Sequence, residues 1–167
     1  MNGPTPLPPT IFIMIIRNAT TKDWKTLKKI KPGLTDAAIE HRLKEQSDGL
    51  ADFIVLEDGG LKSCVVLTYY GKPTHPEYPD IVDLFTTEAS RHQGYGRTLV
   101  NECLKRARDR GAKKIGLSIY KDADPRVQKW YEKLGFRRLK ELPYYYIVKG
   151  TKNWARDFTL DIKPSNS

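Results

Sequence analysis

The sequence predicts a single domain of the α/β class, built on a mixed sheet with a hairpin in its first half. The chain has 167 residues, which suits one domain, and 39% of them are hydrophobic, which suits a folded core. Segments with strand and helix periodicity alternate along the chain. Disordered, collagen-like and disulfide-stabilised chains are excluded by this composition, and no apolar run approaches the roughly 20 residues that cross a bilayer.

The first half of the chain predicts one strand, two helices and a hairpin. Residues 11–17 are a β-branched run typical of a strand. Thr20 and Asp23 approximate a capping box that opens a helix, and Thr35-Asp36 opens a second one. The turn Asp58-Gly59-Gly60 separates two strand-like runs, 53–56 and 61–70, and so predicts a hairpin.

The second half predicts two more helices among strands. A compact strand, 81–86, precedes a long helix whose apolar face includes Leu99 and Cys103 and which Gly111 ends. Residues 115–120 form another strand, and Asp124-Pro125 opens a helix that Gly135 ends. The last strand candidates are 136–142, 144–148 and 158–162.

Charge and cysteine content indicate partners and compartment. The 29 basic residues exceed the 20 acidic ones by nine, which favours anionic partners, although solubility alone explains such a surplus equally well. Cys64 and Cys103 lie far apart, in no metal-binding or redox spacing, so we expect two buried thiols and no metal site. Residues 1–10 lack the basic start and apolar core of a secretory signal, so the expected location is cytoplasmic.

Domain boundaries follow from the composition of the two ends. Residues 1–13 contain four prolines and are expected to form a loose, extended lead-in. The globular domain is expected over residues 14–163, followed by a short tail at 164–167.

The stretch after the strand at 81–86 is the most informative part of the sequence. It leads through Gly94-Tyr95-Gly96 directly into the long helix. Helix N-termini carry unpaired N–H groups and a positive dipole end, and glycines let a ligand approach closely, so an anion such as a diphosphate suits this turn. The P-loop and the dinucleotide fingerprint do not fit, because neither the Gly-Lys-Ser/Thr start nor the third glycine is present.

Two motifs here resemble those of the GNAT superfamily of acetyl-CoA-dependent N-acetyltransferases. Arg91-His92-Gln93-Gly94-Tyr95-Gly96 is similar to its Arg/Gln-x-x-Gly-x-Gly/Ala signature. The stretch from Trp130 to Phe136 is similar to its aromatic-Tyr-Glu-Lys-Leu-Gly-Phe segment. The resemblance implies a single-domain fold with a mixed, mostly antiparallel central sheet of six to seven strands and about four helices. It also implies that the sheet parts between its fourth and fifth strands to hold acetyl-CoA.

The resemblance carries over to individual cofactor-binding residues. Backbone groups of the fourth strand would bind the pantetheine arm, and the following turn would hold the diphosphate. Asp124 stands where many members have a cofactor-binding asparagine, and the alternative for it is a plain helix cap. The implied cofactor-binding set is Leu84, Phe85, Thr86, Arg91, His92, Gln93, Gly94, Tyr95, Gly96, Arg97, Thr98 and Asp124.

Tyr131 and Asp83 are the two catalytic candidates. Tyr131 occupies the family's frequent general-acid position, where a phenol would protonate the leaving thiolate; the alternative is packing under the cofactor. Asp83 precedes Leu84 where some relatives carry a base or an amine anchor. Short apolar flanks predict partial burial and a raised pKa for it, against the alternative of a structural salt bridge. Glu88 and His75 lie on loops and are weaker candidates, and both cysteines are expected to pack in the core.

The expected reaction is direct attack by a primary amine of a protein, peptide or small molecule on the thioester, in a ternary complex. Residues Tyr144–Tyr146 would line an acceptor groove or alternate along a strand. A lysine-rich face at residues 22–31 would meet an acidic partner or simply stay solvated. A non-catalytic acyl-CoA-binding sensor is the alternative function; nucleic-acid binding is disfavoured, since no recognition motif supports it. No membrane association is expected, and the resemblance makes a homodimer possible.

Overall fold

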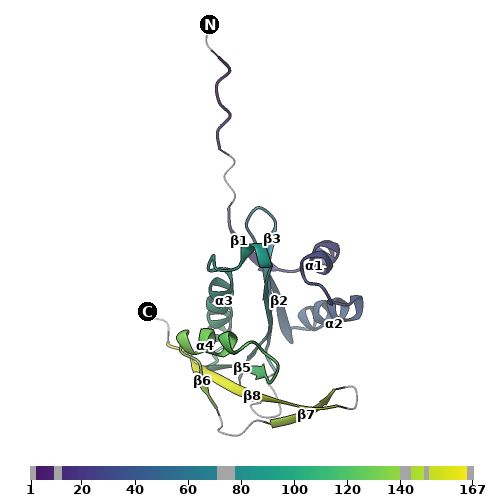
Figure 1. Cartoon of the computed structure of the whole chain (residues 1–167), viewed down its shortest axis with the longest axis vertical. Helices are drawn as coiled ribbons and strands as arrows, with labels where there is room; N and C mark the ends of the chain where they lie inside the picture. Colours follow the sequence, from purple (N-terminus) through teal and green to yellow (C-terminus); the bar gives the residue numbers. More distant parts are fainter. Residues whose placement is uncertain (1–2, 10–12, 71–77, 140–143, 149–150, 165–167) are drawn as a thin grey trace.

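The computed structural model describes residues 3–9, 13–70, 78–139, 144–148 and 151–164, with 144–148 and 151–154 described by their backbone only. Over these residues the chain forms one eight-stranded sheet and four α-helices. Residues 3–9 lie outside any helix or strand, are exposed, and extend away from the domain (Figure 1). No described helix combines the length and apolar character that crossing a membrane requires.

The expected mixed, mostly antiparallel sheet is confirmed. Its order is β1-β2-β3-β4-β5-β8-β6, with β7 also paired to β8, and β4–β5 is its parallel pair. Eight described strands exceed the expected six to seven. The strands are β1 (Ile15–Asn18), β2 (Ala51–Glu57), β3 (Leu61–Thr68), β4 (Asp80–Thr86), β5 (Lys114–Tyr120), β6 (Arg137–Arg138), β7 (Tyr144–Val148) and β8 (Thr151–Asp161).

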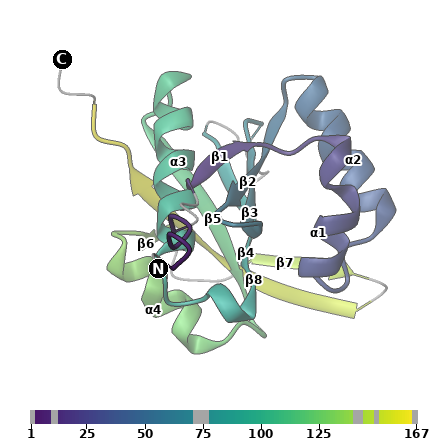
Figure 2. The same ribbon diagram turned by 90° about the horizontal axis from the view of Figure 1, so that it is seen from above.

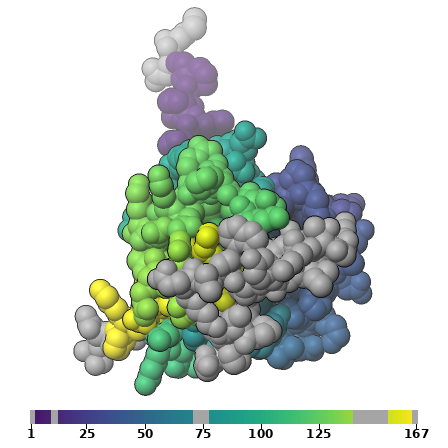
Figure 3. Space-filling view, turned by 60° about the horizontal axis from the view of Figure 1, so that its bottom comes forward, coloured from purple at the N-terminus to yellow at the C-terminus, as the bar shows by residue number. Residues whose placement is uncertain are grey.

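Helices cover both faces of the sheet (Figure 2). One face carries α1 (Trp24–Ile30) and α2 (Asp36–Ser47), and the other carries α3 (Tyr95–Asp109) and α4 (Pro125–Lys133). A space-filling view shows the green segment that includes α4 and the blue segment that includes α2 on opposite flanks (Figure 3). We call these the α1–α2 face and the α3–α4 face.

Each face has its own hydrophobic core, and β2 contributes to both. Ile54 and Leu56 pack toward α3, whereas Phe53 and Val55 pack toward α1 and α2. Side chains alternate along a strand, so an almost continuous apolar run fills two cores at once. Both cysteines are free and buried, as expected: Cys103 lies in the core under α3, and Cys64 lies in the other core.

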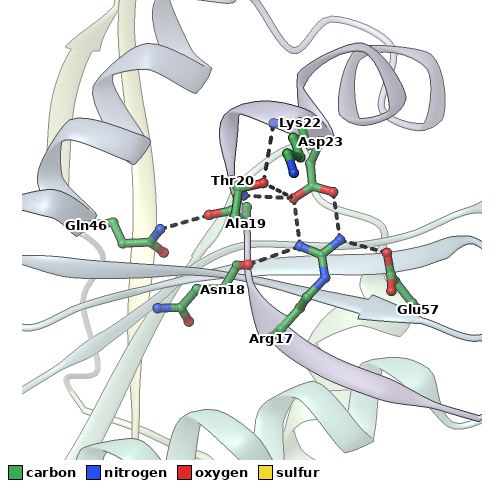
Figure 4. Close-up of polar contacts among 8 residues, drawn as sticks. All are labelled: Arg17, Asn18, Ala19, Thr20, Lys22, Asp23, Gln46 and Glu57. Atoms are coloured by element: carbon green, nitrogen blue, oxygen red, sulfur yellow. Dashed lines mark hydrogen bonds and ion pairs between the residues drawn. The ribbon is translucent and has the colours of Figure 1, made fainter.

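The predicted capping box is present and is part of a larger polar network (Figure 4). Asp23 accepts a hydrogen bond from the Thr20 N–H at 2.8 Å, and its two oxygens accept from the Arg17 guanidinium at 2.8 Å each. Arg17 also donates to Glu57 Oε1 at 2.7 Å. The network therefore fastens the start of the first helical segment to β1 and β2.

Three strand boundaries differ from the sequence prediction. β1 begins at Ile15, with residues 11–12 outside the described part of the chain. The strand expected at 136–142 is reduced to the two residues of β6, with 140–143 not described. β8 begins at Thr151, seven residues before the expected Phe158, because its first half pairs with β7.

Candidate active site where β4 and β5 part

β4 and β5 separate soon after they meet. Their pairing consists of Asp80 with Gly116 and Ile81 with Leu117, although both strands continue for several residues. Residues 82–86 of β4 and 118–120 of β5 therefore leave backbone groups facing this opening without a partner from the other strand. Exposed strand edges of this kind can bind an extended chain through main-chain hydrogen bonds.

A β-bulge at Asp83 changes how β4 presents its side chains. Cys64 pairs with Phe85 and Val66 pairs with Val82, so one residue of β3 stands opposite two of β4. Asp83 takes a φ of 51°, in the left-handed region that a non-glycine residue seldom adopts. As a result Val82 and Phe85 pack on the α1–α2 face, whereas Leu84 packs on the α3–α4 face.

The start of α3 has the features expected of an anion site. Its N-cap is Gly94, with a φ of 84°, no side chain caps the helix, and its first turn contains no acidic residue. Thr98 N–H donates to Gly94 O, which leaves the N–H groups of residues 95–97 without an acceptor within the helix. The side chains of Arg91, His92, Gln93 and Arg97 around this turn are exposed.

Two contacts position this turn. The Tyr95 hydroxyl donates to Asp58 Oδ2 at 2.6 Å, which fastens the start of α3 to the β2–β3 turn. Arg91 Nε donates to the Thr86 carbonyl at 3.3 Å, which joins the loop to the end of β4. The end of β4 is in turn held by Ser63 of β3, whose hydroxyl donates to the Phe85 carbonyl at 2.7 Å and lies 3.0 Å from the Thr86 hydroxyl.

α4 brings Tyr131 to the same region. A Cβ added at Gly96 would lie 3.4 Å from the Trp130 ring and 3.8 Å from the Thr86 hydroxyl, so β4, α3 and α4 converge here. Tyr131 is 9% exposed, and its ring packs edge-to-face with those of Trp130 and Phe136. Burial, with a smaller contribution from Cys103, raises the pKa of the Tyr131 phenol above its ordinary value. The phenol therefore stays protonated at neutral pH.

Asp124 is a helix cap in this structure. Its carboxylate accepts from the Arg126 N–H at 2.9 Å and forms an ion pair with the Arg126 side chain, and this hydrogen bonding lowers the pKa of Asp124 to about 2. Beside it, the end of β5 and the start of α4 line a hollow of about 180 Å³, together with Gln128 and Arg156.

Asp83 differs from its sequence prediction. Partial burial was expected, but its side chain is 45% exposed. The carboxylate forms an ion pair with Arg42 of α2 and lies 3.8 Å from Lys31 Nζ. The bulge and these two cations hold it on the α1–α2 face. A structural salt bridge, the alternative open at the sequence level, is therefore present; whether Asp83 also acts in catalysis stays a prediction.

The weaker candidates are placed as follows. Glu88 is exposed on a short 3-10 turn, and His75 lies outside the described residues. Burial raises the pKa of Cys64 to about 11 and that of Cys103 to about 12, so neither thiol is a thiolate nucleophile at neutral pH. Tyr144–Tyr146 belong to β7, which agrees with the alternative that these three tyrosines lie along a strand. The described residues contain no group of three His, Cys, Asp or Glu able to hold a metal ion.

One polar pair at the opening was missed by the sequence analysis. Ser118 of β5 donates from its hydroxyl to Asp157 Oδ1 of β8 at 2.7 Å, and the two residues are cross-strand partners. Both polar residues adjoin apolar strand residues, namely Leu117, Ile119 and Phe158. That local pattern could have singled them out, but not their contact.

Comparison with known proteins gives the family and the fold. A family model described as Acetyltransferase (GNAT) family matches residues 16–136. A search of curated protein sequences finds no significant match.

Three solved structures illustrate the shared fold. An N-acetyltransferase from Staphylococcus aureus Mu50 is 16% identical, with a TM-score of 0.71, and the match covers 90% of this chain and 99% of that one. A putative acetyltransferase from Salmonella typhimurium, yncA, solved with its cofactor acetyl-CoA, is 17% identical with a TM-score of 0.69, covering 92% and 96%. Spermidine N-acetyltransferase from Vibrio cholerae, in complex with CoA and spermine, is 17% identical with a TM-score of 0.69, covering 89% and 95%.

The family model spans well over half of the chain, and it includes the parted strands, the uncapped start of α3 and Tyr131. The chain therefore belongs to the GNAT family of acetyltransferases.

Proposed function

We propose that this protein transfers the acetyl group of acetyl-CoA to a primary amine by direct attack, with both substrates bound together. The observation that carries the proposal is the convergence of three features in one place. These are the unpaired edges of β4 and β5, the uncapped N-terminus of α3, and the buried phenol of Tyr131.

The residues around the opening fit acetyl-CoA. Unpaired N–H groups at the start of α3, with Arg91 and Arg97 nearby, suit a diphosphate. The open edges of residues 84–86 and 118–120 suit the amide groups of a pantetheine arm. When bound, acetyl-CoA supplies an acetyl thioester whose carbonyl carbon accepts the amine. Asp124 contributes through α4, whose first turn it caps.

Tyr131 is proposed as the general acid that protonates the departing sulfur. Its phenol lies on the α3–α4 face, and among the described residues no protein group takes its hydroxyl proton. An ordinary phenol and a thiolate have similar basicity, so the proton transfer needs little driving force. Asp83 is proposed as an anchor for the acceptor's ammonium group, because its exposed carboxylate already lies beside two cations, Arg42 and Lys31.

The proposal places the reaction in the cytoplasm. Two free, buried thiols that form no disulfide suit a reducing compartment.

A thiol-release assay tests the function. Wild-type protein is incubated with acetyl-CoA and a panel of amines, aminated antibiotics and short peptides. We expect thiol release that depends on at least one amine, and Tyr131→Phe should lower kcat about 100-fold or more. Coenzyme A affinity, measured by calorimetry, should change less than about threefold, because the hydroxyl acts on the leaving sulfur rather than on ground-state binding.

Tyr69→Phe is the matched control. The Tyr69 hydroxyl donates to Asp52 at 2.6 Å, away from the opening, so this variant should keep wild-type kcat. Equal kcat for Tyr131→Phe and wild type would remove Tyr131 as the acid. Tight coenzyme A binding without transfer to any amine would instead indicate an acyl-CoA-binding sensor.

A further inference from the structure

Ser118 and Asp157 stand at the point where the sheet opens. Ser118 directly follows Leu117, the last residue of β5 that pairs with β4. Asp157 is its cross-strand partner on β8, on the other side of β5. The Ser118 hydroxyl donates to Asp157 Oδ1 at 2.7 Å, so a carboxylate is joined to the edge of the opening through one hydroxyl.

The pair lies on the face opposite Tyr131. Leu117 and Ile119 belong to the α3–α4 core, so the intervening Ser118 points to the α1–α2 face. Tyr131 belongs to the α3–α4 core. Tyr131 and the hydroxyl–carboxylate pair therefore lie on opposite faces of the sheet.

Asp157 is a buried carboxylate with no counter-ion among the described residues. Its residue is 5% exposed, and no arginine or lysine of the described chain forms an ion pair with it. Burial of a carboxylate is costly unless the group is hydrogen-bonded or has a function. Asp83, by contrast, is exposed and held by Arg42. Asp80 of β4 is a further buried carboxylate near the point where the strands part, and its strand partner is Gly116.

We propose that Ser118 and Asp157 take the proton from the acceptor's ammonium group. The inference rests on the proposed transferase function and adds the missing proton acceptor to it. Ser118 contacts the amine, and Asp157 receives the proton through the Ser118 hydroxyl. A hydroxyl that donates to a carboxylate still has lone pairs that can accept an N–H. Ser118 can therefore pass the proton to Asp157 without changing its side-chain rotamer.

Ser118, Asp157 and Tyr131 together account for every proton that the reaction moves. An alkylammonium nitrogen loses two protons on the way to a neutral amide. The first goes to Ser118 Oγ as the serine proton moves to Asp157, which frees the nitrogen lone pair to form the N–C bond. The C–S bond breaks, and the sulfur takes the Tyr131 proton. The second nitrogen proton restores Tyr131, and Asp157 loses its proton to solvent before the next turnover.

The experiment compares two acceptors of similar size that differ in amine basicity. At pH 7.5 an alkylamine of pKa about 10.4 is almost wholly protonated, whereas a peptide α-amine of pKa about 7.7–8.0 is roughly a quarter to two-fifths neutral. Asp157→Asn should lower kcat/KM for the alkylamine about 100-fold and for the α-amine less than about 10-fold. Ser118→Ala should show the same selectivity. Coenzyme A binding, measured by calorimetry, should stay within about twofold of wild type for both variants.

Thr159→Val is the matched control, because Thr159 is also a buried polar residue of β8 and lies two positions from Asp157 on the same face. It should change both acceptors by the same factor. An equal loss for the two acceptors with Asp157→Asn and Ser118→Ala, or no loss, overturns the inference while leaving the transferase function standing. Absence of transfer by the wild type overturns both. If Asp157→Asn does not fold, Ser118→Ala decides alone.

Discussion

Two glycines in the turn before and within α3 have different physical roles. Gly94 has a φ of 84°, which an L side chain adopts only with strain. Gly96 lies inside the helix, and a Cβ there would make ordinary contacts at 3.4–3.8 Å with Trp130 and Thr86. Backbone conformation therefore requires glycine at the first position, whereas the second position requires only a small residue.

The same substitution at these two positions should give opposite results. Gly94→Ala should lower the free energy of unfolding by about 1–2 kcal/mol and weaken coenzyme A binding, because relieving the strain turns the N–H groups of residues 95–97. Gly96→Ala should raise stability by up to about 1 kcal/mol, through helix propensity, and keep coenzyme A binding. Urea unfolding and calorimetry measure the two quantities. Similar results for the two variants would contradict the assigned conformations.

Among single residues, the places of Tyr131 in α4 and of the glycine turn before α3 could be predicted because their signals are local in the sequence, whereas their roles stay predictions. Asp83 shows the limit of that approach. Its neighbours suggested burial, but the bulge and the ion pair with Arg42 depend on β3 and α2, which lie far away in the chain. Asp157 was missed for the same reason, since its contact with Ser118 joins residues 39 positions apart.

At the scale of elements, the junction of β1, the first helical segment and β2 depends on one carboxylate. Hydrogen bonds from Arg17 lower the pKa of Asp23, against the opposing effect of burial. A group with a lowered pKa in the folded state stabilises the protein above its unfolded-state pKa, about 3.9 for aspartate. That stabilisation is lost as the pH falls through the folded-state value.

The contribution of Asp23 to stability should therefore be full above about pH 4 and should be lost progressively below it. In urea unfolding from pH 7 to pH 3, Asp23→Asn should cost about 1–3 kcal/mol at pH 7, and its difference from wild type should shrink toward pH 3. The asparagine side-chain oxygen can still accept from the Thr20 N–H, so the difference reports the interaction with Arg17. Glu57→Gln, at the more exposed end of the network, should have a smaller effect. A difference that stays constant with pH would contradict this account.

The helices that capping residues mark in the sequence were predictable, whereas the strands whose ends depend on pairing with another strand were not. Thr35 and Asp124-Pro125 open helices as predicted, because caps act within three residues. The boundary of β8 depends on β7, whose residues add pairs up to Thr151, and no local pattern marks that extension. β6 is short for the converse reason, since it pairs with β8 at two positions.

At the scale of the whole molecule, the opening divides the sheet into two parts. β1–β4 lie on one side and β5, β8, β6 and β7 on the other, joined through the short β4–β5 pairing. A ligand that hydrogen-bonds both edges would substitute for the missing pairs. Binding should therefore stabilise the entire fold and not the contact residues alone.

Coenzyme A should raise the melting temperature by about 5–11 °C at 100 times its Kd, from about 2.7 kcal/mol of linkage in a domain of this size. Hydrogen exchange should slow at residues 82–86 and 118–120 as well as at the start of α3. Adenosine diphosphate, which lacks the pantetheine arm, should slow exchange only at α3. Protection confined to α3 with coenzyme A would show that the strand edges do not bind the arm.

The bulge in β4 also limits which changes in chain length the protein can tolerate. The segment from Val82 to Phe85 contains one residue more than the stretch of β3 opposite it. A deletion there would restore strict alternation and exchange inward and outward positions along the rest of the strand. Position 83 thus requires a residue that tolerates a positive φ, and the number of residues between Val82 and Phe85 is fixed.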